Sequence, residues 1–427
     1  MSISIEAEGP DNLNIVDPDT YASGFPHATF ERLRRTDPVS WWEETDGGKG
    51  FWAVTRYDDL LSVSRNTAVF SNAQGITLEE MEPDDFEARR NMLEYDPPEH
   101  TRYRRLVSRP FSRREVMGYE AAIREIARQV VDDALPGSST VHLDVTERIA
   151  KQLPMRMLGK LLGVPDEDGP WLVERGDALL GNFDPEMTDY PVDLVNTDEF
   201  RAMPFRSPAG LELYRYAEEQ ANLRRACPMH DVINSLLQPA VDGELLSDRE
   251  FKNFFVLLVG AGNDTSRYTM AAGMKALSEH PDQMRDLQRA IGTNPALVES
   301  AVEEILRYST VTMNFRRTAL ADTELNGRSI RAGDKVVIWF TSADHDHDAF
   351  PDPYRFDIRR TPNDHVAFGL RSPHLCLGAQ LARMEIRLLL EELLPRVKDW
   401  AVDGPIERLR SNFIGGMKHL PMTIETR

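Results

Sequence analysis

A turn-rich loop with a cysteine near its end carries the strongest chemical signal in this sequence: Phe368-Gly-Leu-Arg-Ser-Pro-His-Leu-Cys-Leu-Gly378. An amphipathic helix is predicted directly behind it, over residues 377–394. A thiolate just before a helix N-terminus is favoured by the helix dipole and by unpaired backbone N–H groups. Cys376 is therefore a candidate nucleophile or metal-ligating thiolate, and the alternative is that it is a small buried hydrophobic residue.

Composition limits the class of protein that surrounds this loop. The chain has 427 residues, of which 41% are hydrophobic, and its 50 basic and 70 acidic residues give a formal net charge of −20. This acidity argues against nucleic acid and anionic membranes as main partners. The two cysteines, Cys227 and Cys376, do not suggest a disulfide framework, and a reducing compartment fits them.

No targeting or membrane-spanning segment is recognised. The start of the chain is acidic and mixed, without a basic and then apolar leader. The longest dense apolar stretch, 254–261, is far shorter than the about 20 residues that a membrane span needs. A cytoplasmic protein without membrane insertion is therefore expected.

Hydrophobic periodicity predicts a mainly α protein with a small β portion. Ser247-Asp-Arg-Glu250 is a capping box with an apolar run behind it, which opens the longest predicted helix. The predicted helices span 247–278, 296–308 and 377–394, and the predicted strands span 50–55 and 334–340. No linker or repeat divides the sequence, so a single domain over 1–427 is expected, with residues 1–20 loosely ordered.

A second motif, Gly260-Ala-Gly-Asn-Asp-Thr265, lies in the middle of the longest predicted helix. Interior glycines cost up to about 1 kcal/mol each relative to alanine, and a buried aspartate needs partners. The glycines let a bulky group approach the backbone, and Asp264 and Thr265 could pass protons to that group. The alternative is a kinked helix in which Thr265 bonds back to a carbonyl group.

Two further patterns consist of charged residues. Glu304 and Arg307 lie at i and i+3 of a predicted helix and can pair on one face, which by itself is typical of a surface ion pair. The run Asp344-His-Asp-His-Asp348 offers ligands for a hard metal ion and would suit a metal hydrolase. No nucleophile motif accompanies that run.

Taken together and in this order, the motifs resemble those of the cytochrome P-450 family of thiolate-haem monooxygenases. The matching features extend from about residue 57 to residue 418, which is nearly the whole chain. They are Asp96-Pro-Pro-Glu-His-Thr-Arg-Tyr-Arg104, Ala261-Gly-Asn-Asp-Thr265, Glu304-x-x-Arg307, Pro353-Tyr-Arg-Phe356, and Phe368-Gly369 with His374-x-Cys376-x-Gly378. The resemblance implies one large P-450 fold, with haem b buried between the long central helix and the helix behind the cysteine loop.

The resemblance also implies a role for each matched residue. Cys376 would be the axial ligand of the haem iron, and its thiolate would push electron density to favour O–O cleavage. Thr265 would hold the oxygen being activated and a proton-donating water, and Asp264 would relay protons from solvent. The residues that bind the haem propionates would be His100, Arg104, Arg317 and His374. The structural ion-pair triad that supports the cysteine face would be Glu304, Arg307 and Arg355.

The chain departs from the family pattern at two places and resembles one subgroup. Its cysteine loop lacks the usual second glycine and has one residue more between Phe368-Gly369 and Cys376. The run 343–348 differs from the Ala-Asn-Arg-Asp that is common in bacterial members. Residues 261–267 and the tail 408–419 resemble bacterial hydroxylases that oxidise terminal carbons of sterol side chains and methyl-branched lipids, and the tail also resembles terpene-alcohol hydroxylases.

The implied activity is hydroxylation of a hydrophobic small molecule, such as a sterol, a terpenoid or a branched alkyl chain. The implied partners are O₂, a ferredoxin and an NAD(P)H-dependent ferredoxin reductase, and the chain is expected to act as a monomer. The residues expected to line the substrate pocket are Ile76, Gly260, Ala261, Val311, Met313, Phe413 and Ile414, although part of this apolar set is expected to be ordinary core.

A basic strip is the candidate docking surface for an acidic ferredoxin. Arg102, Arg105 and Arg109 fall at i, i+3 and i+7, on a different helix face from His100 and Arg104. Attraction between opposite charges would steer the two proteins together and would weaken with salt. The alternative is an ordinary solvated helix face.

One alternative function keeps the thiolate haem but not the oxygen chemistry: a peroxygenase or a haem sensor. Asp264 and Thr265 argue against it, because a peroxide route can bypass the proton relay that O₂ activation needs. The metal hydrolase built on Asp344–Asp348 is the more remote alternative.

Overall fold

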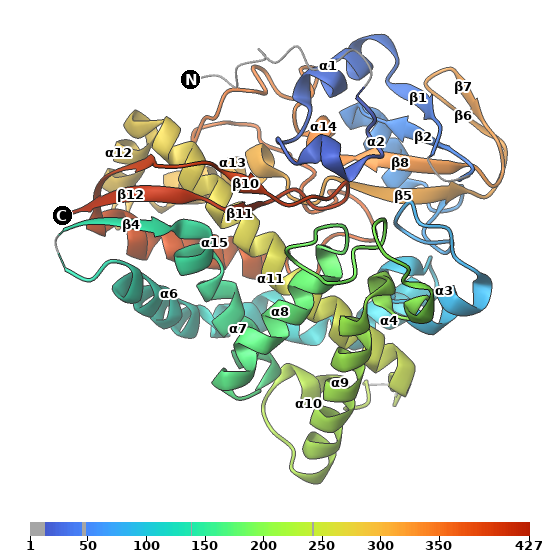
Figure 1. The fold of residues 1–427 in the computed structure, drawn as a ribbon, viewed down its shortest axis with the longest axis horizontal. Helices are drawn as coiled ribbons and strands as arrows, with labels where there is room; N and C mark the ends of the chain where they lie inside the picture. Colours follow the sequence, from blue (N-terminus) through green and yellow to red (C-terminus); the bar gives the residue numbers. More distant parts are fainter. Residues whose placement is uncertain (1–12, 45–47, 138, 241–242) are drawn as a thin grey trace.

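The computed structural model describes residues 13–44, 48–137, 139–240 and 243–427. Its helices are α1 (His27–Thr36), α2 (Tyr57–Arg65), α3 (Pro83–Arg89), α4 (Glu99–Val107), α5 (Arg113–Gly118), α6 (Glu120–Ala134), α7 (Gln152–Leu162), α8 (Gly169–Leu180), α9 (Pro208–Ala226), α10 (Val232–Leu236), α11 (Asp248–Glu279), α12 (Pro281–Ala290), α13 (Pro295–Ser309), α14 (Phe340–Ala343) and α15 (Ala379–Leu393). Helices dominate the fold, as the sequence predicts (Figure 1).

The strands are short and gather into small sheets. They are β1 (Val39–Trp42), β2 (Phe51–Val54), β3 (Phe70–Ser71), β4 (Thr140–Asp144), β5 (Asn314–Ala319), β6 (Thr323–Leu325), β7 (Arg328–Ile330), β8 (Lys335–Trp339), β9 (Val397–Val402), β10 (Glu407–Arg408), β11 (Met417–His419) and β12 (Pro421–Thr426). The largest sheet has the order β1-β2-β8-β5-β3. Its central strand β8 is buried along its whole length, which explains its nearly continuous apolar sequence.

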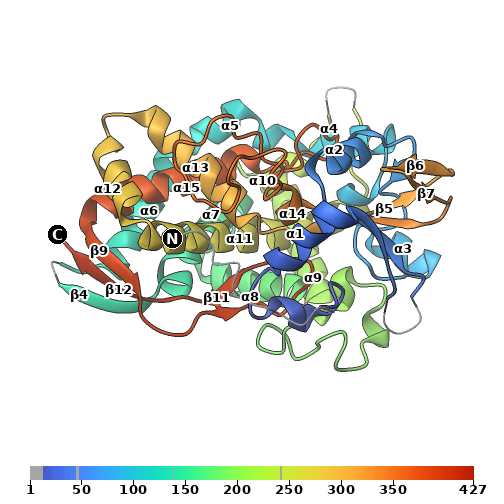
Figure 2. The same ribbon diagram turned by 90° about the horizontal axis from the view of Figure 1, so that it is seen from above.

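The central helix α11 organises the helical part of the molecule. It starts with the expected capping box, in which the Ser247 hydroxyl accepts from the Glu250 N–H and the Glu250 carboxylate accepts from the Ser247 N–H. Figure 2 shows α11 between α13 and α15 on one side and α8 and α9 on the other, and it packs against all four. A Cβ atom added at Gly273 would lie 2.9 Å from the Ile305 side chain, so this glycine permits the close approach of α11 and α13.

The predicted elements are found close to their expected ends. The predicted helices 247–278, 296–308 and 377–394 correspond to α11, α13 and α15, and the predicted strands 50–55 and 334–340 correspond to β2 and β8. The loose order expected for residues 1–20 does not extend to residues 13–20, because Ile15 is fully buried and Pro18–Tyr21 forms a 3₁₀ turn. Residues 1–12 of that segment lie outside the described residues.

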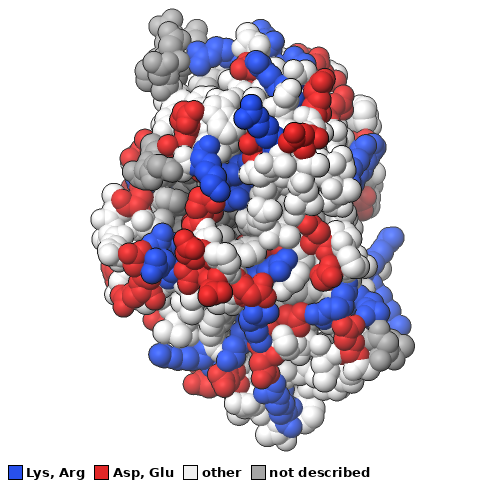
Figure 3. All heavy atoms as spheres, turned by 90° about the vertical axis from the view of Figure 1, so that its right-hand side faces the viewer, with Lys and Arg blue, Asp and Glu red and all other residues white. Residues whose placement is uncertain are grey.

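The charge on the surface is mixed rather than gathered. On the face shown in Figure 3, acidic and basic side chains are interleaved. Charged side chains of the described residues often pair, as Arg206 does with Asp198 at 3.0 Å. Within the described ranges, no helix has both the length and the apolar character that crossing a lipid bilayer requires.

Candidate active site

A mostly apolar cavity lies where α11, α4, β5 and the cysteine loop (residues 368–378) meet. The sequence-predicted site residues that line it are Ile76, Arg104, Ala261, Thr265, Val311, Arg317, His374 and Cys376. The folded chain therefore brings together residues that are up to about 300 positions apart in sequence. The apolar part of the wall includes two residues that the sequence did not single out, Leu257 and Leu258, and it also includes Phe315.

The cysteine loop holds Cys376 at the cavity and just ahead of α15. The Cys376 N–H donates to the Phe368 carbonyl oxygen at 2.9 Å, which closes the loop. Gly369 has a φ of +75° and Arg371 a φ of +58°. The missing second glycine thus leaves an arginine in the left-handed region, which costs a non-glycine residue about 1 kcal/mol.

The environment of the Cys376 thiol combines burial with groups that favour the thiolate. Its surface opens onto the cavity, which lies below the outer surface of the protein. Burial raises the pKa of the thiol, while the backbone N–H groups of Gly378 and Ala379 and the charge of Arg104 act in the opposite direction. A positively charged group bound at the thiol would complete this stabilisation of the thiolate.

Two arginines and one histidine form a polar rim on the cavity, and a second histidine lies behind it. Among the described residues, Arg104 and Arg317 have no ion pair, and the Arg317 guanidinium donates only to the carbonyl oxygen of Arg316, at 2.8 Å. Burial lowers the pKa of Arg317 to about 10. The rings of His100 and His374 lie 4.0 Å apart, and burial lowers their pKa values to about 4 and about 2.

This rim fits a cofactor that carries two carboxylates. Both ring nitrogens of His374 and Nε2 of His100 are buried without a hydrogen-bond partner in the described structure. A buried polar atom without a partner is unfavourable by about 1–3 kcal/mol, and a buried cation needs an anion. Arg104, Arg317 and His374 line the cavity, whereas His100 lies behind His374 and contacts it. The chemistry of a haem, with two propionates and an iron for the thiolate, matches these groups.

Thr265 presents its hydroxyl group to the cavity from the middle of α11. The hydroxyl donates to the carbonyl oxygen of Ala261 at 2.8 Å, which is the back-bond that the sequence left open as an alternative. A hydroxyl group has one proton and two acceptor lone pairs. Because the proton is used on Ala261, the Thr265 oxygen can accept a hydrogen bond from a group in the cavity.

Asp264 lies on a different face of α11 and does not line the cavity. It is buried, and its carboxylate pairs with Arg267 at 2.9 Å, one helical turn further along. Asp177 of α8 pairs with the same guanidinium at 2.9 Å. Burial, reinforced by Asp177 and opposed by Arg267, raises the pKa of Asp264 to about 8.

The predicted ion-pair triad has a different third member. Glu304 and Arg307 form a fully buried pair, with Arg307 Nε donating to Glu304 at 2.8 Å. The side chain of Arg355 is 66% exposed and lies 3.9 Å from Asp357, so it does not reach Glu304. Instead, Arg360 Nε donates to Glu304 at 3.1 Å. Arg355 contributes only its backbone carbonyl oxygen, which accepts from Arg360 at 2.7 Å.

Four of the expected pocket residues lie outside the cavity wall. Gly260 faces Leu180 of α8, and Met313 is packed in a separate apolar cluster with Trp339. Phe413 packs edge-to-face against Phe315 with ring centroids 5.5 Å apart, and Ile414 pairs with the backbone of Thr312 and is buried. Phe413 therefore supports a wall residue from behind. Apolar character alone did not distinguish the wall from the layer of core behind it.

The basic strip is interrupted and partly neutralised. Arg102 pairs with Glu250, and Arg105 Nη2 lies 2.6 Å from Glu244. The helix α4 ends at Val107, so Arg109 does not continue its face. Arg109 is exposed in the 3₁₀ turn η4 (Arg109–Phe111), and the exposed Arg113 and Arg114 follow at the start of α5.

The run Asp344–Asp348 does not form a metal centre. The carboxylate of Asp344 is buried and accepts from Thr310 Oγ1 at 2.7 Å, whereas the carboxylate of Asp346 accepts from the Tyr57 N–H at 2.9 Å. His345 packs against His27, and His347 lies 3.6 Å from Glu31. Because these side chains diverge, the structure removes the basis of the hydrolase alternative.

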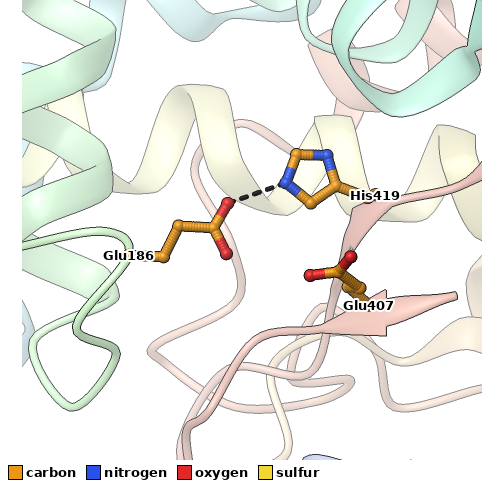
Figure 4. Close-up of side chains that lie close together, drawn as sticks. All are labelled: Glu186, Glu407 and His419. Atoms are coloured by element: carbon orange, nitrogen blue, oxygen red, sulfur yellow. Dashed lines mark hydrogen bonds and ion pairs between the residues drawn. The ribbon is translucent and has the colours of Figure 1, made fainter.

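One group of metal-ligand types does converge among the described residues: Glu186, Glu407 and His419 (Figure 4). Its histidine has no free nitrogen, because Nε2 bonds Glu186 at 2.7 Å and Nδ1 bonds Asp144 at 2.6 Å. The ammonium of Lys418 also pairs with Glu186. These contacts make an ion-pair cluster that ties residues 181–207, between α8 and α9, to β11 and β4.

Three charged residues near the site were not predicted from the sequence: Asp177, Arg360 and Glu385. Asp177 lies among the apolar residues of α8, and an acid on the apolar face of a helix is the signal that could have identified it. Glu385 lines the cavity from α15, and burial raises its pKa to about 8. Arg360 lies in coil, where periodicity gives no signal.

Comparison with known proteins shows which family this chain matches. Residues 13–398 match the family model described as Cytochrome P450. A steroid C26-monooxygenase of Mycobacterium tuberculosis is 37% identical over 422 residues, which cover 96% of this chain and 92% of that protein. A methyl-branched lipid omega-hydroxylase of the same species is 37% identical over 400 residues, which cover 92% and 90%.

Solved structures show the same architecture. A cytochrome P450 of Mycobacterium marinum in complex with pseudoionone has a TM-score of 0.85 at 35% identity and covers 98% of this chain and 99% of its own. A structure from Bacillus megaterium in complex with corticosterone has a TM-score of 0.77 at 29% identity and covers 94% and 98%.

Proposed function

Because this chain belongs to the cytochrome P450 family of monooxygenases, we propose that it hydroxylates a sterol side chain, a terpenoid or a methyl-branched lipid. The observation that carries the proposal is that the Cys376 thiol and the Thr265 hydroxyl open onto one mostly apolar cavity. Such a cavity favours an apolar substrate. The names of the steroid and lipid relatives, and the pseudoionone complex of the structural neighbour, support this range of substrates.

The family implies a haem cofactor, and we assign haem b to this cavity. Cys376 would ligate the iron, and Arg104, Arg317 and His374 would bind the propionates, with His100 packed behind His374. When bound, the haem supplies the iron centre at which O₂ is activated and oxygen is transferred to the substrate. The residues of the chain orient the two reactants, exclude bulk water and supply protons.

Thr265 and Asp264 have separate tasks in this proposal. The Thr265 oxygen accepts a hydrogen bond from a water in the cavity, because its own proton is held by the Ala261 carbonyl oxygen. That water is thereby positioned to donate a proton. Asp264, in the acid form that burial favours, replaces the proton that is consumed.

Substrate titration of the haem-loaded protein tests the proposed substrate class. An apolar ligand that fits the cavity is expected to displace water from the iron and to shift the spin state, which absorbance reports directly. Sterols, terpenoids and methyl-branched lipids should produce this shift, and a matched panel of polar small molecules should not. Saturating spectral changes with the polar panel alone would contradict the proposal.

We further propose that electrons come from an acidic ferredoxin that binds the exposed Arg109, Arg113 and Arg114. Reversing two charges, Arg109→Glu with Arg113→Glu, is expected to lower the rate of reduction at low salt by about tenfold. Arg331→Glu, in the exposed turn between β7 and β8, is the control for charge reversal. Equal reduction rates for all three proteins would remove this surface from the proposal.

Thr265→Ala tests the assignment of the oxygen chemistry. Positioned proton donors contribute about 100-fold or more, so product formed per NADH should fall by at least about tenfold, with hydrogen peroxide in its place. Thr269→Ala is the matched control, since Thr269 also lines the cavity and its hydroxyl also donates back along the helix, to the carbonyl oxygen of Thr265 at 2.8 Å.

A wild-type protein that turns over with peroxide but not with NADH, reductase and ferredoxin would instead be a peroxygenase, and turnover with neither would fit a haem sensor.

A further inference from the structure

A buried cluster of charges joins α8 to α11 beside the proposed proton donor. Asp177 of α8 and Asp264 of α11 both pair with the guanidinium of Arg267, each at 2.9 Å. The Asp177, Asp264 and Arg267 side chains are 9%, 1% and 2% exposed. The cluster crosses the most extensive helix–helix contact that α11 makes.

The hydrogen bonds in this cluster leave space for one proton between the two carboxyl groups. Oδ1 of Asp264 accepts from Asn263 Nδ2 and Arg267 Nη2, both at 2.9 Å. Oδ1 of Asp177 is buried and has no aligned hydrogen-bond donor, although the Arg267 guanidinium is close. Oδ1 of Asp177 and Oδ1 of Asp264 both lie 2.9 Å from the same nitrogen, Arg267 Nη2, so the two carboxyl groups are close neighbours. A proton on Asp264 therefore satisfies the Asp177 oxygen.

Electrostatics favours the same arrangement. Two carboxylates in contact in a buried site cannot both ionise readily. Burial raises the pKa of Asp264 to about 8. Burial also acts upward on Asp177, but Arg267, the contact with Asp264 and Lys151 outweigh it and lower the pKa of Asp177. The proton is thus held mainly by Asp264.

The cluster reaches solvent on one side, and on the other side it is separated from the cavity by the backbone of α11. Lys151, at the start of α7, lies 3.5 Å from Asp177 Oδ2 and is 21% exposed, and it also pairs with Glu147 at 3.1 Å. Tyr268 closes the cluster within α11, where its hydroxyl oxygen accepts from Arg267 at 2.9 Å. On the cavity side, Thr265 follows Asp264 in the chain, but the two side chains lie on different faces of α11, so the Asp264 carboxyl group has to rotate to reach the cavity.

We propose that Asp177 is a positioning residue for proton delivery, which shares one proton with Asp264, keeps Asp264 in its acid form at neutral pH and reloads it from Lys151. This inference rests on the proposed oxygen chemistry of the Thr265 site. In the transfer, the Asp264 carboxyl group rotates toward the cavity, its O–H bond breaks and the proton passes to water held by Thr265. Two carboxylates then face two cations, Arg267 and Lys151. The Lys151 ammonium returns a proton through Asp177 and regains one from solvent.

The shared proton can be observed without turnover, by infrared spectroscopy of the haem-loaded protein. The wild-type carbonyl band of the protonated acid is expected at neutral pH and should disappear as the pH rises through about 8. In Asp177→Asn, Arg267 acts on Asp264 without an opposing carboxylate, so the band should be lost already at neutral pH. An Asp177→Asn protein that keeps the band with its wild-type midpoint would overturn the proposal.

Matched variants assign the band. Glu385→Gln should remove a different carboxylic acid band, because burial raises the pKa of Glu385 to about 8 as well. Asp264→Asn should remove the same band as Asp177→Asn, whereas Thr265→Ala should keep it. If Asp177→Asn does not fold, Asp177→Glu moves the carboxylate by one methylene group, and an unchanged band and midpoint in that variant would likewise overturn the proposal.

Turnover provides the second measurement. In Asp177→Asn the alkaline limit of NADH-coupled product formation should shift to lower pH, and product per NADH at neutral pH should fall severalfold. A purely structural role of Asp177 would lower stability without moving this limit. A shifted infrared band with an unmoved limit would refute the role in delivery. If the wild type lacks oxygen activity but its band behaves as expected, the proposed function fails and the shared proton stands.

Discussion

Replacing Cys376 with serine is expected to abolish both the thiolate–haem spectrum and the monooxygenase activity. The thiolate is favoured here by two backbone N–H groups and by the charges of Arg104 and Arg383. These groups do not suffice to ionise a serine hydroxyl. Mutating a residue that only hydrogen-bonds a metal ligand already lowers metal affinity or activity by about 10–100-fold. Loss of the ligand itself should therefore lower activity by at least about 100-fold. The reduced, carbon-monoxide-treated protein should lose its red-shifted Soret band.

The second cysteine of the chain is the natural control for this experiment. Cys227 is exposed just after the end of α9 and does not line the cavity. Cys227→Ser should therefore keep the spectrum and the activity of the wild type. A red-shifted band that survives in Cys376→Ser but is lost in Cys227→Ser would mean that the axial ligand has been assigned to the wrong cysteine.

The parts of the fold that the sequence predicts well are those with a local signal. The helix α11 begins at a capping box, whose two residues, Ser247 and Glu250, are three positions apart in the chain. The same holds for the cysteine loop, where Cys376 and the start of α15 are adjacent. Resemblance to a family then placed Arg104, Arg317 and His374 at one cavity, which periodicity alone could not do.

The errors arise where two residues of the same type compete for one tertiary contact. Arg355 and Arg360 both lie in coil, and both are cations near a buried acid. The backbone path decides between them: it turns the Arg355 side chain outward and brings the Arg360 guanidinium to Glu304. No pattern in the sequence records that path. Met313 and Phe413 were misplaced for a related reason, because an apolar residue is equally stable in a cavity wall and in the core behind it.

The buried pair Glu304–Arg307 leads to the second large prediction. Glu304 accepts hydrogen bonds from Arg307, Arg360, the Asp357 N–H and Asn363. Glu304→Gln preserves the shape of the side chain but removes its charge, which leaves two buried guanidinium groups without a carboxylate. Breaking a buried ion pair in this way costs about 3–5 kcal/mol, a large part of the stability of a typical protein. Denaturant unfolding of the haem-loaded variant should show this loss.

The neighbouring acid makes a matched control, because Glu303→Gln is the same substitution one residue earlier on α13. Glu303 is 31% exposed and pairs with Arg383 at 2.6 Å and with His365 at 3.0 Å, contacts that water can partly replace. The loss at neutral pH should therefore be smaller, about 1–2 kcal/mol. Burial raises the pKa of Glu303, but His365 and Arg383 outweigh it and lower the pKa from 4.5 to about 2. The stability that Glu303 contributes is thus present above pH 4.5 and lost as the pH falls through about 2. Equal losses of unfolding free energy in the two variants would show that solvent reaches Glu304. The buried Glu304–Arg307 pair would then not be what supports the cysteine side of the fold.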